Sequence, residues 1–453
     1  MMTKWLGIKG GKTLVGKPGG DSKTAVTQDI LIDNGVIVEV GEVIAFPPGA
    51  EVLDVQGCFV LPGFVDLHCH MREPGDEESE TIHSASIAGA NGGFCCVVAM
   101  PNTTPAIDGP DMVELIRSKS TSALIDVEVA GAISKAREGK ALSEMNEMAR
   151  LGVKIFTDDG CGVQDSRLML SAMQYSLTSN SILAQHCEDS YLASGGHLHD
   201  GDVSSVLGVQ GIPNEGEEAM AYRDILLAKK TGARLHLMHM STQRVLEIVQ
   251  QARDWGVDIT CEVTPHHLSL THESVKSLNP NLKVNPPLRT ANDCHSLIEG
   301  LIKGQIDAIA TDHAPHHPDK KDVPFEEASF GMLGLETAFS VVFTLLTQDK
   351  FPASPELIKP SSIDTIQALA IIQRAMSETP SKIAGVEKRH GGPIEPGRVA
   401  NLAIIDPSRC WTVAANKLAS KSRNTPFDGI ELIGKVVHTI AKGKLVVSDG
   451  GSL

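Results

Sequence analysis

Eight short apolar runs, separated by segments of helical composition, fill the middle of this 453-residue chain. The runs cover residues 63–70, 94–100, 125–133, 153–157, 182–186, 234–240, 257–263 and 306–310. Continuous apolar strands that alternate with helices are typical of a parallel sheet covered by helices on both faces. Eight such units predict an α/β fold, a closed (β/α)8 barrel of the TIM type. An open doubly wound sheet is the alternative, and no glycine-rich phosphate-binding motif supports it.

The two ends of the chain share a different, β-rich pattern. Residues 29–32 and 36–40 flank Asn34-Gly35, a hairpin signal, and short β-like runs recur at 399–406, 434–440 and 444–447. Because chain termini often lie close together, we predict one discontinuous domain made by both ends. The predicted boundaries are residues 1–60 plus 388–453 for a small β-sandwich-like domain and residues 61–387 for the barrel.

Charge and cysteine usage exclude some classes of protein. A formal charge of -16 argues against nucleic acid or an anionic membrane surface as the main partner. A small anionic substrate remains compatible with this charge if cations are placed locally. Residues 1–17 lack the continuous apolar segment of a secretory signal, and no apolar run has the length of a membrane span. Nine cysteines without Cys-x-x-Cys spacing predict free thiols and a cytoplasmic location.

Six of the eight runs end in polar side chains that bind metals or substrates. These residues are His68, His70, Arg72, Asn102, Asp158, Asp159, His186, His239, Asp312 and His316. In a barrel the carboxyl ends of all strands meet on one face, which is where barrel enzymes carry their chemistry. Burying these carboxylates and imidazoles without a cation is unfavourable, so we expect them to hold metal. Four histidines and two aspartates exceed one tetrahedral zinc and favour a two-metal hydrolytic site.

The same residues carry a family resemblance. The motifs are Asp66-Leu-His-Cys-His-Met-Arg-Glu-Pro-Gly75, Met100-Pro-Asn-Thr103, Phe156-Thr-Asp-Asp-Gly160, His186-Cys-Glu-Asp189, His239-Met-Ser-Thr242, Asn285-Pro-Pro-Leu-Arg289, Thr311-Asp-His-Ala-Pro-His316 and Gly334-Leu-Glu-Thr337. Over nearly its whole length the chain resembles the amidohydrolase superfamily and, within it, the dihydroorotases of the longer bacterial class. The His-x-His pair alone would indicate only the superfamily. The motif from Asn285 to Arg289 and the Asp-Asp-Gly sequence are more discriminating.

The resemblance implies a cytoplasmic, zinc-dependent enzyme of pyrimidine synthesis that reversibly cyclises N-carbamoyl-L-aspartate to L-dihydroorotate, with two ions per subunit. The implied metal ligands are His68, His70, Asp159, His186, His239 and Asp312. Asp312 would also act as the catalytic base and then as the acid. The implied substrate-binding residues are Arg72, Asn102, Asn285, His316, Phe330 and Gly331. A homodimer and an association with aspartate transcarbamoylase are further expectations.

Several alternatives stay open at this stage. A carbamylated Lys154, or Asp158, could replace Asp159 as the bridging ligand. The activity could be that of a hydantoinase, dihydropyrimidinase or allantoinase, or the chain could be a non-catalytic scaffold for aspartate transcarbamoylase. Residues 319–324 are read as a mobile flap or a solvated loop. The remaining histidines are predicted to be structural or exposed, namely His83, His199, His236, His266, His267, His313 and His317.

Overall fold

A closed parallel barrel forms the centre of the computed structural model, which describes residues 5–16, 20, 23–358 and 363–453. Its strands are β6 (Phe64–Cys69), β7 (Phe94–Ala99), β8 (Asp126–Val129), β9 (Ile155–Phe156), β10 (Ile182–Gln185), β13 (Arg234–Leu237), β14 (Ile259–Val263) and β15 (Ala308–Ile309). Neighbouring strands pair in parallel, and single parallel bridges at Gly131–Phe156 and Cys69–His313 join the two sheet segments into a ring. The predicted (β/α)8 fold is confirmed.

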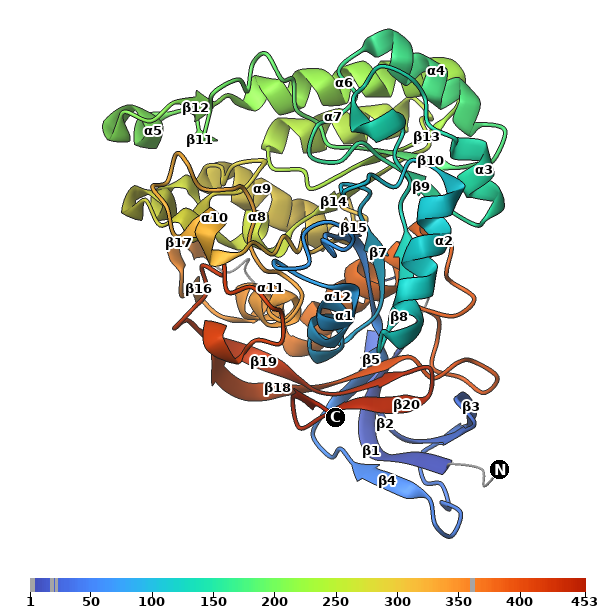
Figure 1. Cartoon of the computed structure of the whole chain (residues 1–453). Coiled ribbons are helices and arrows are strands. Elements are labelled where there is room, and N and C mark those ends of the chain that lie inside the picture. Colours follow the sequence, from blue (N-terminus) through green and yellow to red (C-terminus); the bar gives the residue numbers. More distant parts are fainter. Residues whose placement is uncertain (1–4, 17–19, 21–22, 359–362) are drawn as a thin grey trace.

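Helices surround this barrel (Figure 1). They are α1 (Ile82–Asn91), α2 (Pro110–Lys119), α3 (Met145–Arg150), α4 (Ser166–Ser176), α6 (Asn214–Thr231), α7 (Gln243–Asp254), α8 (Pro265–Ser269), α9 (Ala291–Ile302), α11 (Ala338–Thr347), α12 (Thr365–Gln373) and α13 (Thr379–Ile383). Local sequence explains several starts: Thr242 and Thr290 accept hydrogen bonds from the backbone of the first turns of α7 and α9, and Pro110 opens α2. A short arm of β11 (Leu198–His199), α5 (Asp202–Leu207) and β12 (Gly211–Ile212) extends beside α6.

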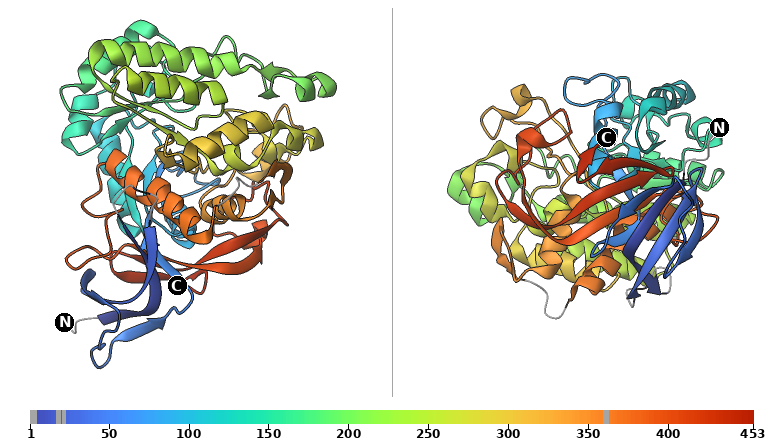
Figure 2. Two further views of the ribbon diagram at one scale, coloured as in Figure 1. Left: turned by 180° about the vertical axis from the view of Figure 1, so that it is seen from behind. Right: turned by 90° about the horizontal axis from the view of Figure 1, so that it is seen from below.

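Strands from both chain ends form one sheet below the barrel (Figure 1 and Figure 2). Its members are β1 (Trp5–Gly16), β2 (Lys23–Asp33), β3 (Val36–Gly41), β4 (Glu51–Asp54), β5 (Phe59–Pro62), β18 (Leu402–Thr412), β19 (Glu431–Ala441), β20 (Lys444–Ser448) and β21 (Gly451–Ser452). The antiparallel pair of β5 and β18 joins the N-terminal strands to the C-terminal ones. The hairpin at Asn34-Gly35 is confirmed, with both residues at positive φ.

Strand β1 was missed by the sequence pattern, and β5 runs across the expected boundary at residue 60. Three glycines at positions 7, 10 and 11 interrupt the alternation of β1, where its register with β2 also shifts. The boundaries of the two domains stay a prediction. A second small hairpin, β16 (Lys350–Phe351) with β17 (Ser354–Ile358), and the short helix α10 (Pro318–Lys321) complete the elements that position the site.

The connection from β5 to β6 sets the direction of the barrel strands relative to the sheet. Strand β5 belongs to the sheet and is followed after Gly63 by β6, so β6 starts at the sheet and ends on the far side of the barrel. A Cβ at Gly63 would lie 2.2 Å from the sulfur of Cys95, so only glycine permits this close approach. An apolar layer fills the barrel interior and includes Val65, Ala184 and Ile383. The carboxyl ends of the strands therefore open away from the sheet.

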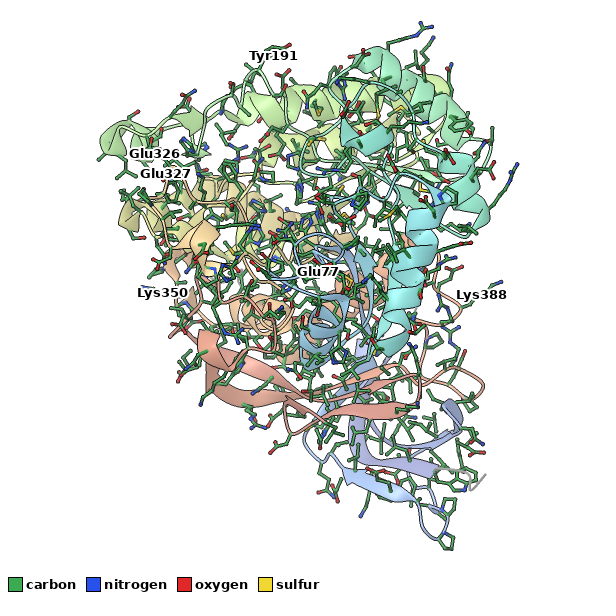
Figure 3. The ribbon with its side chains drawn as sticks, viewed as in Figure 1. Glu77, Tyr191, Glu326, Glu327, Lys350 and Lys388 are labelled. Carbon is green, nitrogen blue, oxygen red and sulfur yellow. The ribbon has the colours of Figure 1, made fainter. Side chains whose placement is uncertain are left out.

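Acidic side chains lie on the surface, as the negative net charge suggests, and the cysteines are free thiols, as predicted. Acidic side chains such as Glu77, Glu326 and Glu327 are exposed (Figure 3). All nine cysteines are free, and Cys69, which lies between the predicted ligands His68 and His70, is fully buried in the outer core. Within the described ranges, no helix combines the length and apolarity needed to cross a bilayer.

Candidate metal centre

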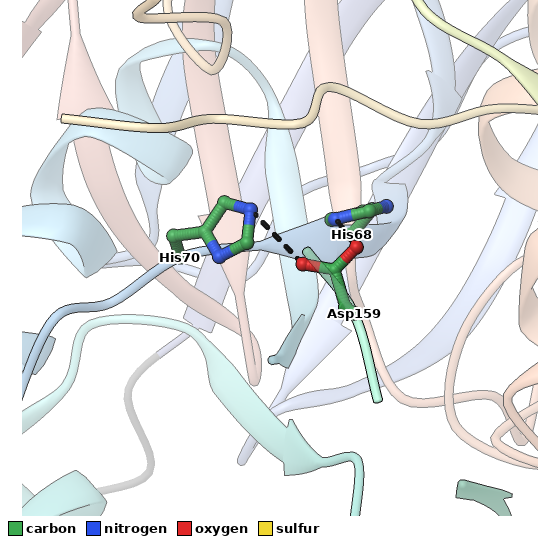
Figure 4. A group of neighbouring side chains, drawn as sticks. All are labelled: His68, His70 and Asp159. Atoms are coloured by element: carbon green, nitrogen blue, oxygen red, sulfur yellow. Dashed lines mark ion pairs between the residues drawn. The ribbon is translucent and has the colours of Figure 1, made fainter. Parts of the chain in front are cut away.

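Two groups of potential ligands share one carboxylate at the carboxyl end of the barrel. The first group is His68, His70 and Asp159 (Figure 4), and the second is Asp159 with His186 and His239. All five side chains are buried. Because Asp159 belongs to both groups, its two oxygens can serve two ions at once.

In the first group the Nε2 atoms of both histidines face the carboxylates. His68 Nε2 lies 3.4 Å from Asp159 Oδ1, and His70 Nε2 lies 3.5 Å from Asp159 Oδ2. Asp312 Oδ1 approaches the same two nitrogens, at 3.5 Å from His68 and 3.0 Å from His70. These four side chains surround one position with two nitrogens and two carboxylates.

In the second group two ring nitrogens face each other. His186 Nδ1 and His239 Nε2 are 2.9 Å apart, and each lies 3.7 Å from Asp159 Oδ1. Two imidazoles in this arrangement with a carboxylate supply the nitrogen and oxygen ligands that zinc accepts. His68 Nε2 provides a second indication, because it is buried and has no hydrogen-bond partner among the described residues. The donor set fits a pair of metal ions.

The structure separates the three candidates for the bridging position. Asp158 points elsewhere and accepts hydrogen bonds from the backbone nitrogens of Ile133 and Ser134, at 2.9 and 3.0 Å, and from the Ser134 hydroxyl. Lys154 is exposed, and its aliphatic stem lies beside Gly385, away from the ligand groups. Of these three residues, Asp159 alone lies among the histidines.

The buried carboxylates are held in their ionised form. Burial raises the pKa of Asp159, but His68 and the neighbouring histidines outweigh burial and hold it well below its usual value. Burial likewise raises the pKa of Asp312, and His68 and His70 reverse the effect. Burial lowers the pKa of His68, yet Asp159 and Asp312 raise it well above its usual value. The site therefore attracts positive charge, whether as protons or as metal ions.

Three functional side chains start from backbone in the left-handed region. Arg72, His239 and Asp312 have φ of 59°, 32° and 46°. Such conformations cost about 1–3 kcal/mol each and persist where the surroundings determine them. Next to Asp312, the backbone nitrogen and hydroxyl of Thr311 donate to the buried Asp66, at 2.8 and 2.5 Å, and hold the turn in place.

A pocket of about 180 Å³ opens directly above the ligand groups. Its lining includes Arg72, Asn102, Asp159, His186, His239, Asn285, Asp312, His316, Phe330 and Gly331, together with His70. Every substrate-binding residue predicted from the sequence lies in this lining, and His68 lies beneath it. Their individual roles stay predictions.

Arg72 is the cation of this pocket. Its Nε donates to the Pro315 carbonyl at 3.0 Å, and its Nη2 lies 3.3 Å from His316 Nε2. Within the described part of the chain, no carboxylate pairs with Arg72, and Nη1 has no acceptor. His316 Nε2 lies 2.7 Å from the Phe330 carbonyl, and burial together with Arg72 lowers the pKa of His316 to about 2. Arg72 is therefore free to bind an anion.

Two amide side chains complete the polar lining. Asn102 Oδ1 accepts from His70 Nδ1 at 2.9 Å, which leaves the amide NH2 of Asn102 as its group for a ligand. Asn285 Oδ1 is buried and has no partner among the described residues. The Gly331 nitrogen donates to the Lys283 carbonyl at 2.8 Å, so this N–H serves the loop. The pocket thus offers one cation, one donor amide and one unpartnered acceptor.

Sequence reasoning missed three residues around the site. Glu262 Oε1 lies 3.1 Å from His68 Nδ1. Its only signal in the sequence was a charged residue within the apolar run 257–263. Arg137 donates to the Asp159 carbonyl at 2.6 Å and had no sequence signal. Lys321, in the segment read as a flap or a solvated loop, is buried and donates to the backbone carbonyls of residues 280, 283 and 329. Motion of this segment stays a prediction.

The other histidines lie outside both ligand groups. His236 pairs with Glu262, and His267 bridges the Thr264 side chain and the Pro286 carbonyl. His313 accepts from the backbone nitrogens of residues 334 and 335. These contacts agree with the structural role expected for them.

Solved structures with a similar fold include hydantoinases. The L-hydantoinase (dihydropyrimidinase) from Arthrobacter aurescens matches with a TM-score of 0.84 at 23% identity, over 100% of this chain and 98% of that one. The D-hydantoinase (dihydropyrimidinase) from Thermus sp. matches with a TM-score of 0.80 at 23% identity, over 99% and 96%. At this identity the likeness concerns the fold. The barrel, its attached sheet and the ligand groups at the strand ends define the class, a metal-dependent amidohydrolase.

Sequence comparison narrows this class. A family model described as dihydro-orotase-like matches residues 57–245. A dihydroorotase from Pelotomaculum thermopropionicum is 41% identical over 442 residues, 98% of each chain, and one from Streptomyces coelicolor is 42% identical over 453 residues, 99% of each. The chain belongs to the dihydroorotase family, and the resemblance read from its motifs is confirmed.

Proposed function

We propose that the pocket catalyses the reversible ring closure of N-carbamoyl-L-aspartate to L-dihydroorotate. The observation that supports this most directly is Arg72, a cation without a carboxylate partner among the described residues, in the pocket above the two ligand groups. Hydantoin and dihydrouracil have no carboxylate that such a residue could bind. The relatives named dihydroorotases support the same assignment.

The pocket's polar groups match the functional groups of dihydroorotate. The Nη1 donors of Arg72 would bind the substrate carboxylate through charge-assisted hydrogen bonds, since Nε is already engaged by Pro315. The amide NH2 of Asn102 adds a further donor for the carboxylate. The unpartnered Asn285 Oδ1 would accept a hydrogen bond from a ring N–H. The substrate is thereby held with its ring above Asp159 and Asp312.

Asp312 is proposed as the group that moves the proton. Burial raises its pKa, but His68 and His70 outweigh burial and hold the pKa below its usual value, which favours the ionised form, and its Oδ1 lies 3.0 Å from His70 Nε2. In ring opening it would take a proton from the attacking water and return it to the leaving ring nitrogen, and in ring closure these transfers run in reverse. When bound to the ligand groups, metal ions would supply Lewis acidity and lower the pKa of a coordinated water.

Turnover by metal-reconstituted protein tests the proposal. We expect dihydroorotate to be opened with a much higher kcat/KM than dihydrouracil, hydantoin or allantoin, and an Asp312→Asn variant to lose turnover while keeping its fold. Preference for an uncharged ring would assign the chain to another cyclic amidase. A metal-loaded protein that turns over none of these rings would instead be a non-catalytic relative.

The proposal extends to cofactor and assembly. We propose two zinc ions per subunit, held by His68, His70, Asp159 and Asp312 and by Asp159, His186 and His239. We also propose a cytoplasmic homodimer that can associate with aspartate transcarbamoylase. Elemental analysis of the purified protein, light scattering, and co-purification from the native cell measure these properties separately.

A further inference from the structure

One buried carboxylate links a predicted metal ligand to a histidine outside the ligand groups. Glu262 lies on β14 and is 1% exposed. Its Oε1 lies 3.1 Å from His68 Nδ1, and its Oε2 lies 3.0 Å from His236 Nε2. Both oxygens of this carboxylate are therefore engaged by imidazole rings.

The hydrogen-bond inventory assigns a proton to each contact. A carboxylate only accepts hydrogen bonds, so His68 Nδ1 and His236 Nε2 must both carry hydrogen. In the neutral ring His236 Nδ1 then has a lone pair, which can accept from the Thr260 hydroxyl at 2.8 Å. Thr260, His236 and Glu262 form a chain in which every proton has one consistent position.

The consequence falls on His68. In the neutral ring, the form that binds a cation, hydrogen on Nδ1 leaves the lone pair of His68 on Nε2, the buried atom without a hydrogen-bond partner among the described residues that faces Asp159 and Asp312 at 3.4 and 3.5 Å. The opposite tautomer would direct an N–H at the ligand position. Glu262 thus selects the form of His68 that can bind a cation.

His70, the second histidine of this ligand group, has a neutral hydrogen-bond partner instead of a carboxylate. His70 Nδ1 donates to Asn102 Oδ1, a neutral amide oxygen, at 2.9 Å. An anionic partner increases the basicity of the ligating nitrogen more than a neutral partner does. His68 is therefore the more basic metal ligand of the two histidines. The amide NH2 of Asn102 remains available to a molecule in the pocket.

We propose that Glu262 is a positioning residue that fixes the tautomer and orientation of His68 for metal binding, with His236 and Thr260 holding the carboxylate in place. This inference rests on the metal centre of the proposed function, though not on the identity of the substrate. A merely structural role would require only that the buried carboxylate be hydrogen-bonded. Metal affinity distinguishes the two roles.

The test measures metal binding in the absence of substrate. Glu262→Gln keeps the size of the side chain but places an amide N–H against one of the two rings, so His68 or His236 must change its tautomer. We expect chelator competition to show affinity for one of two ions weakened by about 10- to 100-fold and the other ion retained. The matched control is Glu336→Gln, which changes a carboxylate that contacts Asn91 and a backbone nitrogen and belongs to neither ligand group. It should bind both ions like the unaltered protein.

Unchanged affinity of Glu262→Gln for both ions would overturn the proposal. If this variant does not fold, the tautomer of His68 is measured instead in the metal-free, unaltered protein at a pH high enough for the ring to be neutral, with 15N-labelled histidine and a His68→Gln variant for assignment. A hydrogen on Nδ1 supports the inference, and a hydrogen on Nε2 overturns it. Protein that binds two ions but prefers an uncharged ring would refute the proposed substrate and leave this inference standing. Unaltered protein that binds no metal would refute both.

Discussion

Substrate selectivity should depend on Arg72 more than on any other pocket residue. Arg72→Met removes the cation but leaves Asp159, Asp312 and the ligand histidines in place. Among the described residues, the guanidinium has no carboxylate partner to leave unpaired, so the loss should appear in substrate binding and not in stability.

The magnitude follows from the donors that remain free. Nε is engaged by the Pro315 carbonyl and Nη2 lies against His316, which leaves the two N–H groups of Nη1 to make two charge-assisted hydrogen bonds to a carboxylate. At about 1.5–3 kcal/mol each, these bonds amount to about 3–6 kcal/mol. The corresponding loss in kcat/KM for dihydroorotate is about 10²- to 10⁴-fold. Arg72→Lys keeps the positive charge but lacks the planar guanidinium, so its kcat/KM for dihydroorotate should lie between those of Arg72→Met and the unaltered protein.

The assay compares dihydroorotate with dihydrouracil, which has the same ring without the carboxylate. In Arg72→Met the kcat/KM for dihydrouracil should change little, so the ratio of the two values falls by the same factor. Arg150→Met, which changes an exposed arginine paired with Glu147, is the matched control and should keep both values. An unchanged ratio in Arg72→Met, with normal metal content, would refute the assignment of Arg72 to the carboxylate.

Three further predictions concern the pocket, the metals and the contact of barrel strand β8 with the C-terminal part of the chain. Gly331→Ala should lower kcat/KM at least tenfold in steady-state assays with metal content unchanged, because φ there is 127° and a Cβ would lie 2.6 Å from Ala314 Cβ. Metal at a thousandfold excess over its Kd should stabilise the protein by about 4 kcal/mol, so chelation should lower Tm in calorimetry. Burial raises the pKa of Asp126, but hydrogen bonds from His390 and Lys442 outweigh it and hold the pKa below its usual value. The stability that this depressed pKa contributes is present above about pH 4 and lost as pH falls through the folded pKa. Asp126→Asn should therefore cost about 2 kcal/mol in urea unfolding at pH 7 and less below pH 4.

The sequence predicted features that repeat or lie close together along the chain. The eight apolar runs predicted the barrel because most of these strands are buried on both faces, and barrel topology brings their polar ends to one face. His68 and His70 were predicted as metal ligands only when the other strand ends were considered with them, and the structure places both beside Asp159.

Contacts across the barrel could not be predicted in the same way. Glu262 and His68 are separated by 194 residues, and their contact depends on how the strands are staggered around the ring. Arg137 reaches Asp159 from a loop whose backbone is in the left-handed region, a conformation that the sequence did not indicate. The glycines in β1 have no side chains to alternate, so that strand had no periodic signal.

The division of the site between strands and loops explains why the resemblance extends nearly to the C-terminus. The metal ligands come from strand ends, but the pocket wall at residues 314–316 and 330–331 is held by Asn424, far along the chain. Asn424 Nδ2 donates to the carbonyls of Ala314 and Gly331, at 2.9 and 3.2 Å, and its Oδ1 accepts from the His316 nitrogen at 3.1 Å. One amide thus fixes two loops that lack regular structure of their own. In the proposed assignment, ion binding needs only the strand ends whereas substrate binding needs these loops, so the C-terminal segment would contribute to substrate recognition without touching the proposed metal ligands.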